Sequence, residues 1–368
     1  MKKTIYLLVS FAFLGFYACV DNEVKPSEHQ PNLPETAYRY SDVNIPEFVD
    51  FNGQNNLNPD NPKITDKGAT LGRVLFYDNK LSINNKVSCG SCHLQSKAFA
   101  DDKDFSIGFE GKLTERNSIA IINPSLCKNL FWDSRASSAL DLTLKPVQNH
   151  IEMGMEDMDF LATKLSKVDY YPDLFKDAYG STEITPQKIS DAVAQFLCSM
   201  TTFNSKFDKA RSQNFNSFTA LERKGQQLFN STKLKCATCH SGITFNAELS
   251  TSSYSSPDVK GTTNIGLDRK SKDEGKKDGE FRIPSLRNIA LTAPYMHDGR
   301  FKTLEEVIDH YSKNIKFNEN LDMKLRNGDT ALKMNISDDE KVALVAFLKT
   351  LTDDTYINDP KFSDPFEK

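Results

Sequence analysis

The sequence lacks several features that mark large protein classes. Its 368 residues contain no block of lysine or arginine and carry a formal net charge of -4, so nothing supports a nucleic-acid partner. No apolar run reaches the roughly 20 residues that span a bilayer, and no clear strand pattern is present. Tryptophan occurs once, as Trp132. The length itself predicts two ordinary domains.

The first residues predict where the protein goes. Two lysines precede the apolar run 5–16, which is too short to cross a bilayer and is typical of a signal peptide over residues 1–18. Cys19 follows a small residue, as in the lipobox of bacterial lipoproteins. We therefore expect export to the periplasm or cell envelope with a lipid anchor on Cys19, and plain secretion is the alternative. Residues 19–45 are polar and contain prolines, which is typical of a tether.

Four cysteines form the strongest motifs. Residues 89–93 read Cys-Gly-Ser-Cys-His, residues 236–240 read Cys-Ala-Thr-Cys-His, and both fit C-x-x-C-H. This spacing lets two thiols add to the vinyl groups of a haem while the next histidine binds the iron. Disulfides, a zinc site and a redox dithiol are the alternatives, and none of them requires that histidine. The sequence therefore predicts two covalently bound haems c, one on Cys89, Cys92 and His93 and one on Cys236, Cys239 and His240.

Each motif lies in one half of the chain and follows a predicted amphipathic helix, over 68–77 and over 220–229. Further helices are predicted from Thr185 and over 337–351, and the segment 250–279 is expected to be a surface loop. We expect a mainly α fold with two cytochrome c-like haem domains and long loops. The predicted order is a signal peptide (1–18), a tether (19–45), an N-terminal haem domain (46–212) whose helix from 185 packs between the domains, a C-terminal cytochrome c domain (213–355) and a tail (356–368).

Stretches around these motifs resemble the bacterial diheme cytochrome c peroxidases and their relatives of the MauG type, over roughly residues 65–352. The resemblance implies an oxidoreductase of the cytochrome-c peroxidase type with two haems c. The matching stretches are Leu81-Ser82, Arg116-Asn117-Ser118, Phe131-Trp132-Asp133-Ser134-Arg135-Ala136, Pro146-Val147, Ile151-Glu152-Met153, Pro284-Ser285-Leu286-Arg287-Asn288 and Pro294-Tyr295-Met296-His297-Asp298-Gly299.

The resemblance also implies roles for single residues. Hydrogen peroxide would bind at the haem of His93, and Glu152 would be the acid–base group that moves a proton between the peroxide oxygens. The haem of His240 would pass on electrons from a small donor cytochrome or cupredoxin. Trp132 would lie between the haems as a relay. The family's calcium positions match Asn117, Thr292 and Pro294, the last two through backbone carbonyls.

Two positions, Phe109 and Tyr311, depart from the best-known peroxidases. Phe109 stands where those enzymes have a histidine that caps the resting haem, and since phenylalanine cannot bind iron, we expect an open sixth position. Tyr311 stands where they have the methionine ligand of the electron-transfer haem, and tyrosinate would lower that haem's potential. Met296 or a later methionine is the alternative ligand. MauG-type enzymes, which oxidise a protein partner, have Tyr at the matching place. Leu142 replaces a glutamine that some relatives have near the distal pocket.

The leading hypothesis is therefore reduction of hydrogen peroxide to water with electrons from a small redox protein. One alternative is a MauG-like oxidase that modifies a protein partner. Another is a diheme electron carrier without catalysis, which Glu152 and the open iron position argue against. The sequence leaves open the electron donor, the pairing of Cys127 and Cys198, and the oligomeric state, although homodimers are common among the relatives.

Overall fold

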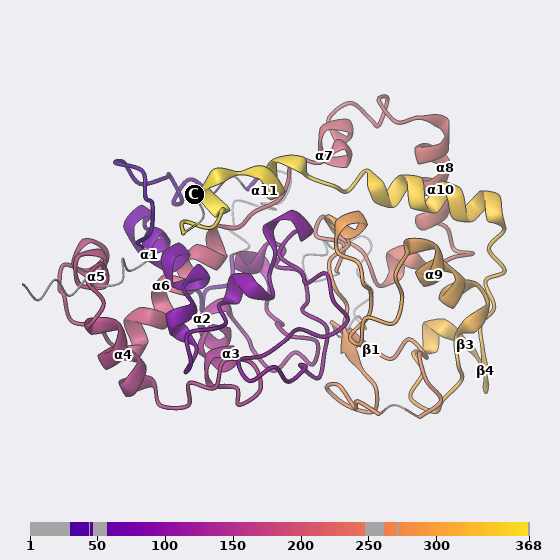
Figure 1. Ribbon diagram of the computed structural model, residues 1–368. Coiled ribbons are helices and arrows are strands. Elements are labelled where there is room, and N and C mark those ends of the chain that lie inside the picture. Colours follow the sequence, from indigo (N-terminus) through magenta and orange to yellow (C-terminus); the bar gives the residue numbers. More distant parts are fainter. Residues whose placement is uncertain (1–29, 44, 47–56, 247–260, 271, 367–368) are drawn as a thin grey trace, which may run out of the picture. The chain divides into compact units, whose positions relative to one another are not determined.

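The protein consists of helices joined by long loops (Figure 1). The computed structural model describes residues 30–43, 45–46, 57–246, 261–270 and 272–366. All of these except Gln30 belong to one unit, Pro31–Lys368. The predicted signal peptide and Cys19 lie outside the described residues. Within the described part of the chain, no helix combines the length and hydrophobicity that a membrane crossing demands.

The helices confirm the mainly α expectation. In chain order they are α1 (Asp66–Tyr77), α2 (Ala139–Leu142), α3 (Leu144–Gln148), α4 (Met158–Ser166), α5 (Tyr171–Tyr179), α6 (Pro186–Ser199), α7 (Lys206–Arg211), α8 (Ala220–Phe229), α9 (Leu304–Asp309), α10 (Asp338–Lys349) and α11 (Asp354–Asn358). The four predicted helices correspond to α1, α6, α8 and α10.

Two short antiparallel ribbons, which the sequence did not predict, complete the described structure. They pair β1 (Thr262–Thr263) with β2 (Phe281–Arg282), and β3 (Arg326–Asn327) with β4 (Thr330–Ala331). A strand of two residues is too short to leave an alternating hydrophobic pattern, which is why no strand was predicted.

Side-chain caps begin the predicted helices. Before α8, Thr219 Oγ1 accepts a hydrogen bond from Glu222 N at 3.2 Å, and the Glu222 carboxylate accepts one from Thr219 N at 2.7 Å. Before α6, Thr185 Oγ1 accepts from Lys188 N at 3.3 Å, and Pro186 occupies the first helical position. Such caps supply partners for N–H groups that a helix start leaves unpaired. Thr185 and Thr219 therefore cap the starts of α6 and α8.

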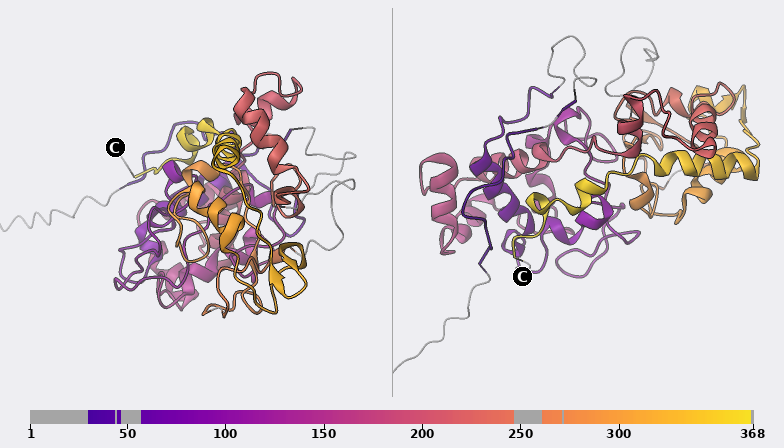
Figure 2. Two further views of the ribbon diagram at one scale, coloured as in Figure 1. Left: turned by 90° about the vertical axis from the view of Figure 1, so that its right-hand side faces the viewer. Right: turned by 90° about the horizontal axis from the view of Figure 1, so that it is seen from above.

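Two helix crossings have the same local geometry. In α1, a Cβ atom added to Gly72 would lie 1.9 Å from Ala192 O of α6. In α8, a Cβ atom added to Gly225 would lie 1.9 Å from Ala343 O of α10. Figure 1 and Figure 2 show α8 and α10 side by side. Each pair contributes to its own hydrophobic cluster, and each pair's first helix precedes one C-x-x-C-H motif.

The C-terminal segment packs onto the first helix pair and not onto the second. Arg73 Nε of α1 donates to Ser363 O at 2.6 Å, and Tyr77 Oη donates to Phe362 O at 2.6 Å. Tyr356 and Phe362 are almost fully buried in the same cluster as α1 and α6. The residues expected to form a tail thus contribute to the core around the first motif.

Candidate active site

The histidines of the two C-x-x-C-H motifs line different cavities. Each motif begins with a 3₁₀ turn, Cys89–Ser91 in one half and Cys236–Thr238 in the other. His93 lines a cavity that also contains Glu152, whereas Cys236, Cys239 and His240 line a second cavity with a mostly apolar wall.

Both motif histidines are held in the form that can bind iron. His93 Nδ1 lies 2.7 Å from Phe99 O, and His240 Nδ1 lies 2.9 Å from Phe245 O. A carbonyl oxygen can only accept, so each Nδ1 carries the proton and each Nε2 keeps its lone pair. Burial lowers the pKa of both imidazoles, which favours the neutral ring, and the backbone hydrogen bonds of His93 with Phe99 and of His240 with Phe245 and Pro284 oppose this effect. These residues fit a haem ligated through Nε2.

The accepting carbonyls share an unusual backbone conformation. Phe99 has φ 61° and Phe245 has φ 55°, in the left-handed region that bulky residues rarely occupy. Residues held in such conformations cost free energy and persist only where their surroundings impose them. In both halves of the chain, the surrounding packing therefore maintains a strained backbone whose carbonyl orients the motif histidine.

The thiols do not fit the alternative assignments. Burial raises the pKa of Cys89 and of Cys236 to about 12, whereas a redox dithiol needs a lowered thiol pKa. Within the described residues, no group of three His, Cys, Asp or Glu side chains is arranged to hold a metal ion. A zinc site built from both C-x-x-C pairs is therefore not formed.

Glu152 is carried on a tight turn at the cavity of His93. Asn149 Oδ1 accepts hydrogen bonds from Ile151 N at 2.8 Å and from Glu152 N at 3.1 Å. Asn149 O accepts from Gly154 N at 2.8 Å, which closes the turn on its other side. Asn149 thus fixes the backbone that presents Glu152, a role that the sequence did not reveal.

Burial raises the pKa of Glu152 to about 7, and the nearby Arg135 guanidinium partly opposes that rise. Arg135 lines the same cavity, stacks over the Phe131 ring at 3.6 Å and donates to Asp133 at 2.9 Å. Asp133 in turn accepts from Arg116 at 2.6 Å. Arg135 belongs to a recognised stretch but had no predicted role, because only the fold brings it near Glu152.

Phe109 lies beside the turn but is not among the residues that line the cavity. Its N–H donates to Glu152 O at 3.0 Å. Its ring packs over Gly154, where an added Cβ atom would come within 2.5 Å of the ring. Leu142, at the position where some relatives have glutamine, does line the cavity.

Trp132 lines both cavities. Its indole Nε1 donates to Asn117 O at 2.9 Å, and Asn117 N donates to His297 O at 2.7 Å. The His297 ring stacks on Phe281 at 3.7 Å and meets the indole edge-on at 6.5 Å. The single tryptophan is thus fixed in the wall that the two cavities share.

Comparison with known proteins supports the same family. The sequence pattern described as di-haem cytochrome c peroxidase matches residues 66–216. The cytochrome c551 peroxidase of Nitrosomonas europaea is 32% identical over 290 residues, which cover 78% of this chain and 80% of that protein. The chain belongs to the diheme cytochrome c peroxidase and MauG family.

Both branches of this family are represented among the relatives. The methylamine utilization protein MauG of Methylophilus methylotrophus is 28% identical over 300 residues, covering 79% of this chain and 84% of that protein. A crystal structure of a MauG-like protein associated with microbial copper homeostasis superposes with a TM-score of 0.75 at 33% identity, covering 88% and 99% of the two chains. Membership implies two haems c, and the relatives named as peroxidases support an oxidoreductase activity.

In this diheme family member, Tyr311 lines the same cavity as His240. It lies in a π-helical turn, His310–Asn314, directly after α9, and not in a continuous α-helix. Such turns often occur at functional sites. Met296 and Met334 line the cavity as well, so the structure brings together the tyrosine and both alternative sulfur ligands.

The residues predicted to bind calcium also lie together. Asn117, Thr292 and Pro294 all line the cavity of His240. The side-chain nitrogen of Asn117 donates a hydrogen bond to Lys103 O at 2.9 Å. The side-chain oxygen of Asn117 therefore points away from Lys103 O. Calcium binding there stays a prediction.

The two remaining cysteines are both buried, and the nearby Cys127 thiol adds to the effect of burial that raises the pKa of Cys198 to about 12. Cys198 is buried on α6 and forms no disulfide bond, so it is not paired with Cys127. The Cys127 sulfur accepts a hydrogen bond from Arg282 Nη2 at 3.2 Å. Arg282 lines both cavities, and its contact with Cys127 could not be found from sequence spacing because 155 positions separate the two residues.

Proposed function

We propose that the protein reduces hydrogen peroxide to water at the cavity of His93. The observation that carries this proposal is the half-buried Glu152, which lines that cavity while the Phe109 ring packs over Gly154 instead of lining the cavity. Cys89, Cys92 and His93 would hold a haem, whose iron would supply the redox chemistry for peroxide reduction. A carboxyl group with a pKa near neutrality is suited both to take up a proton and to return it.

In this proposal each residue has a defined task. Glu152 takes the proton from one peroxide oxygen and delivers it to the other, which leaves as water when the O–O bond breaks. The second oxygen also becomes water, with two electrons from the donor protein and two protons from solvent. Asn149 holds the turn that carries Glu152. Trp132 relays electrons between the cavities, and His240 ligates the haem that receives them from a small cytochrome or cupredoxin.

Oxidation of a protein partner, as in the MauG branch, is the second candidate. Tyr311 in the cavity of His240 favours it, because a tyrosinate ligand lowers a haem's potential and stabilises its oxidised form. A haem of lowered potential would hold an oxidising equivalent that comes from peroxide, and the partner protein would supply the electrons that reduce it again. Peroxide is activated by Glu152 in both candidates.

Stopped-flow mixing of the diheme protein with peroxide and a pre-reduced small cytochrome separates these functions. Catalytic oxidation of the cytochrome supports the peroxidase. Reaction of the haems with peroxide while the cytochrome stays reduced supports the MauG-like oxidase. Failure of both haems to react would leave the electron carrier as the remaining hypothesis and would overturn the proposal.

The rate of the peroxide reaction is expected to fall below a midpoint near pH 7. Burial raises the pKa of Glu152 to about 7, and only the deprotonated carboxylate can take the first proton. One protonation makes the rate fall about tenfold per pH unit below the midpoint. Arg135→Gln removes the opposing charge, so its midpoint is expected at higher pH. Stopped-flow pH profiles of both proteins test this, and coincident midpoints would contradict it.

Tyr311→Phe is expected to change the electronic spectrum of the C-terminal haem and to raise its potential, because the oxygen ligand is removed. The signals of the N-terminal haem should stay as they are. Tyr295→Phe is the matched control, since Tyr295 lines the same cavity but its hydroxyl donates to Ile289 O at 3.0 Å. Identical low-spin spectra for wild type and Tyr311→Phe would assign the ligand to Met296 or Met334.

The remaining sequence predictions complete the proposal. The protein is exported through residues 1–18 and held in the periplasm or cell envelope by a lipid on Cys19. Two haem domains meet near residue 212, and a calcium ion binds at Asn117, Thr292 and Pro294. A homodimer is the oligomeric state proposed by analogy with the relatives.

A further inference from the structure

Three consecutive backbone carbonyls after the second motif are each held by a side chain. Arg287 Nε donates to Ile243 O at 2.9 Å, and Ser285 Oγ donates to Thr244 O at 2.5 Å. The third carbonyl, Phe245 O, accepts from His240 Nδ1 at 2.9 Å. The loop 243–245 orients His240. Hydrogen bonds from Ser285 and Arg287 hold the carbonyls of its first two residues.

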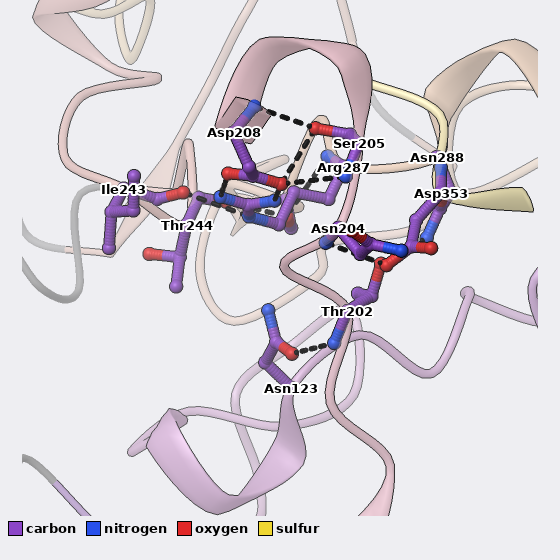
Figure 3. Close-up of polar contacts among 11 residues, drawn as sticks. Asn123, Thr202, Asn204, Ser205, Asp208, Ile243, Thr244, Arg287, Asn288 and Asp353 are labelled. Atoms are coloured by element: carbon purple, nitrogen blue, oxygen red, sulfur yellow. Dashed lines mark hydrogen bonds and ion pairs between the residues drawn. The ribbon is translucent and has the colours of Figure 1, made fainter. Parts of the chain in front are cut away.

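Arg287 is itself clamped by a buried carboxylate. Its Nη1 and Nη2 atoms donate to Asp208 at 2.9 and 2.8 Å, and the two side chains are 0% and 4% exposed (Figure 3). A two-pronged pair of this kind fixes the plane of the guanidinium group as well as its position. The Phe203 ring lies under that plane at 4.5 Å. Arg287 thus has little freedom to move away from Ile243 O.

Asp208 belongs to the segment that connects the two helix pairs. Ser205 and Asp208 form the capping box of α7, with Ser205 Oγ donating to the carboxylate at 2.7 Å. Just before it, Thr202 N donates to Asn123 Oδ1 at 2.8 Å, and Thr202 Oγ1 donates to Asp353 at 3.0 Å (Figure 3). The segment that carries Asp208 is therefore held, through Thr202, by Asn123 of the N-terminal half and by Asp353 near the C-terminus.

The first motif uses a different support. Phe99, whose carbonyl orients His93, is fully buried and packs edge-on against Tyr356 at 5.4 Å and Phe362 at 6.5 Å. Apolar packing thus holds the loop after His93, whereas a buried ion pair holds the loop after His240. A change in the ion pair should affect one histidine only.

We propose that Arg287, clamped by Asp208, is a positioning residue that keeps Phe245 O on His240 Nδ1 and so sets the potential of the C-terminal haem. A carbonyl on Nδ1–H makes the imidazole a stronger donor to iron, which stabilises the oxidised metal. Because Phe245 has a positive φ, its carbonyl stays in place only while Ile243 and Thr244 are held. The inference rests on the proposed function in one respect, the assignment of His240 as an iron ligand.

Arg287→Lys in the full diheme protein tests this. Lysine keeps the positive charge next to Asp208 but lacks the Nε–H that reaches Ile243 O. Spectroelectrochemical titration is expected to show a higher potential for the C-terminal haem and an unchanged one for the N-terminal haem. The His240 Nδ1–H proton, followed by paramagnetic NMR in D₂O, should exchange about tenfold faster as its hydrogen bond weakens.

Arg300→Lys is the matched control. Arg300 pairs with Asp268 at 2.7 Å in the same half of the chain, but no hydrogen bond described for it reaches residues 243–245. Neither readout should change in this variant. Ser285→Ala is the second test variant, because it releases Thr244 O without altering any charge, and it decides the matter if Arg287→Lys does not fold. A smaller shift in the same direction is expected for it.

The experiment distinguishes failure of the inference about Arg287 from failure of the proposed function. If the folded test variants keep the wild-type potential and exchange rate, Arg287 has no positioning role and the inference is overturned, while the proposed function stands. If the wild-type protein shows no histidine-ligated second haem, the assignment of His240 fails, and the proposed function fails with it.

Discussion

Glu152→Gln is expected to lower the rate of reaction with hydrogen peroxide by about 10²- to 10⁴-fold, the usual contribution of a positioned acid–base group. Glutamine has nearly the same shape and leaves the backbone contacts of the turn with Asn149 in place. It cannot accept a proton from peroxide at any accessible pH. The variant should therefore also lose the pH dependence that the wild-type carboxylate gives.

Stopped-flow absorbance of the haems after mixing with peroxide measures this effect. Glu156→Gln is the matched control, because Glu156 is exposed on the same stretch of chain and is not among the residues that line the cavity of His93. Its rate should equal that of the wild type. A Glu152→Gln rate within twofold of wild type would show that another group moves the proton, and the proposed role of Glu152 would be withdrawn.

Gly225→Ala is expected to destabilise the protein by about 1–3 kcal/mol or more, as overpacking of a close contact does. At an open position in a helix the same change stabilises by up to about 1 kcal/mol, because alanine is the better helix former. Here the new Cβ atom would lie 1.9 Å from Ala343 O and 2.8 Å from Phe347 Cβ. Helix α8 would have to move away from α10. A decrease in the free energy of unfolding would therefore show that the two helices cross in close contact at Gly225.

Denaturant unfolding followed by circular dichroism measures the change in the free energy of unfolding. Lys224→Ala, at the neighbouring exposed position of α8, is the control and should be neutral. Gly72→Ala should destabilise to a similar degree, since its Cβ atom would meet Ala192 O of α6 at the same 1.9 Å. An increase in stability for Gly225→Ala would mean that the two helices are further apart than described.

Much of the candidate site follows from features that are local in the sequence. The haem motifs fit within five residues, so their spacing alone predicts covalent attachment and the identity of His93 and His240 as ligands. Caps such as Thr219 mark helix starts because they act on backbone groups only two or three positions away. The stretches that carry the family resemblance likewise indicated Glu152 and Trp132, and the position that matches the family's axial ligand indicated Tyr311.

Other features depend on contacts between distant parts of the chain. No local pattern reports that Arg287 reaches Asp208 and Ile243, that Arg135 faces Glu152, or that the segment around Phe362 closes the first core. Burial and charge neighbours also decide the pKa of Glu152, and both arise only when the chain is packed. The sequence by itself indicated which groups are candidates to carry the chemistry, because covalent spacing is local. The tertiary structure decided how those groups are oriented and tuned, because that depends on residues far apart in sequence.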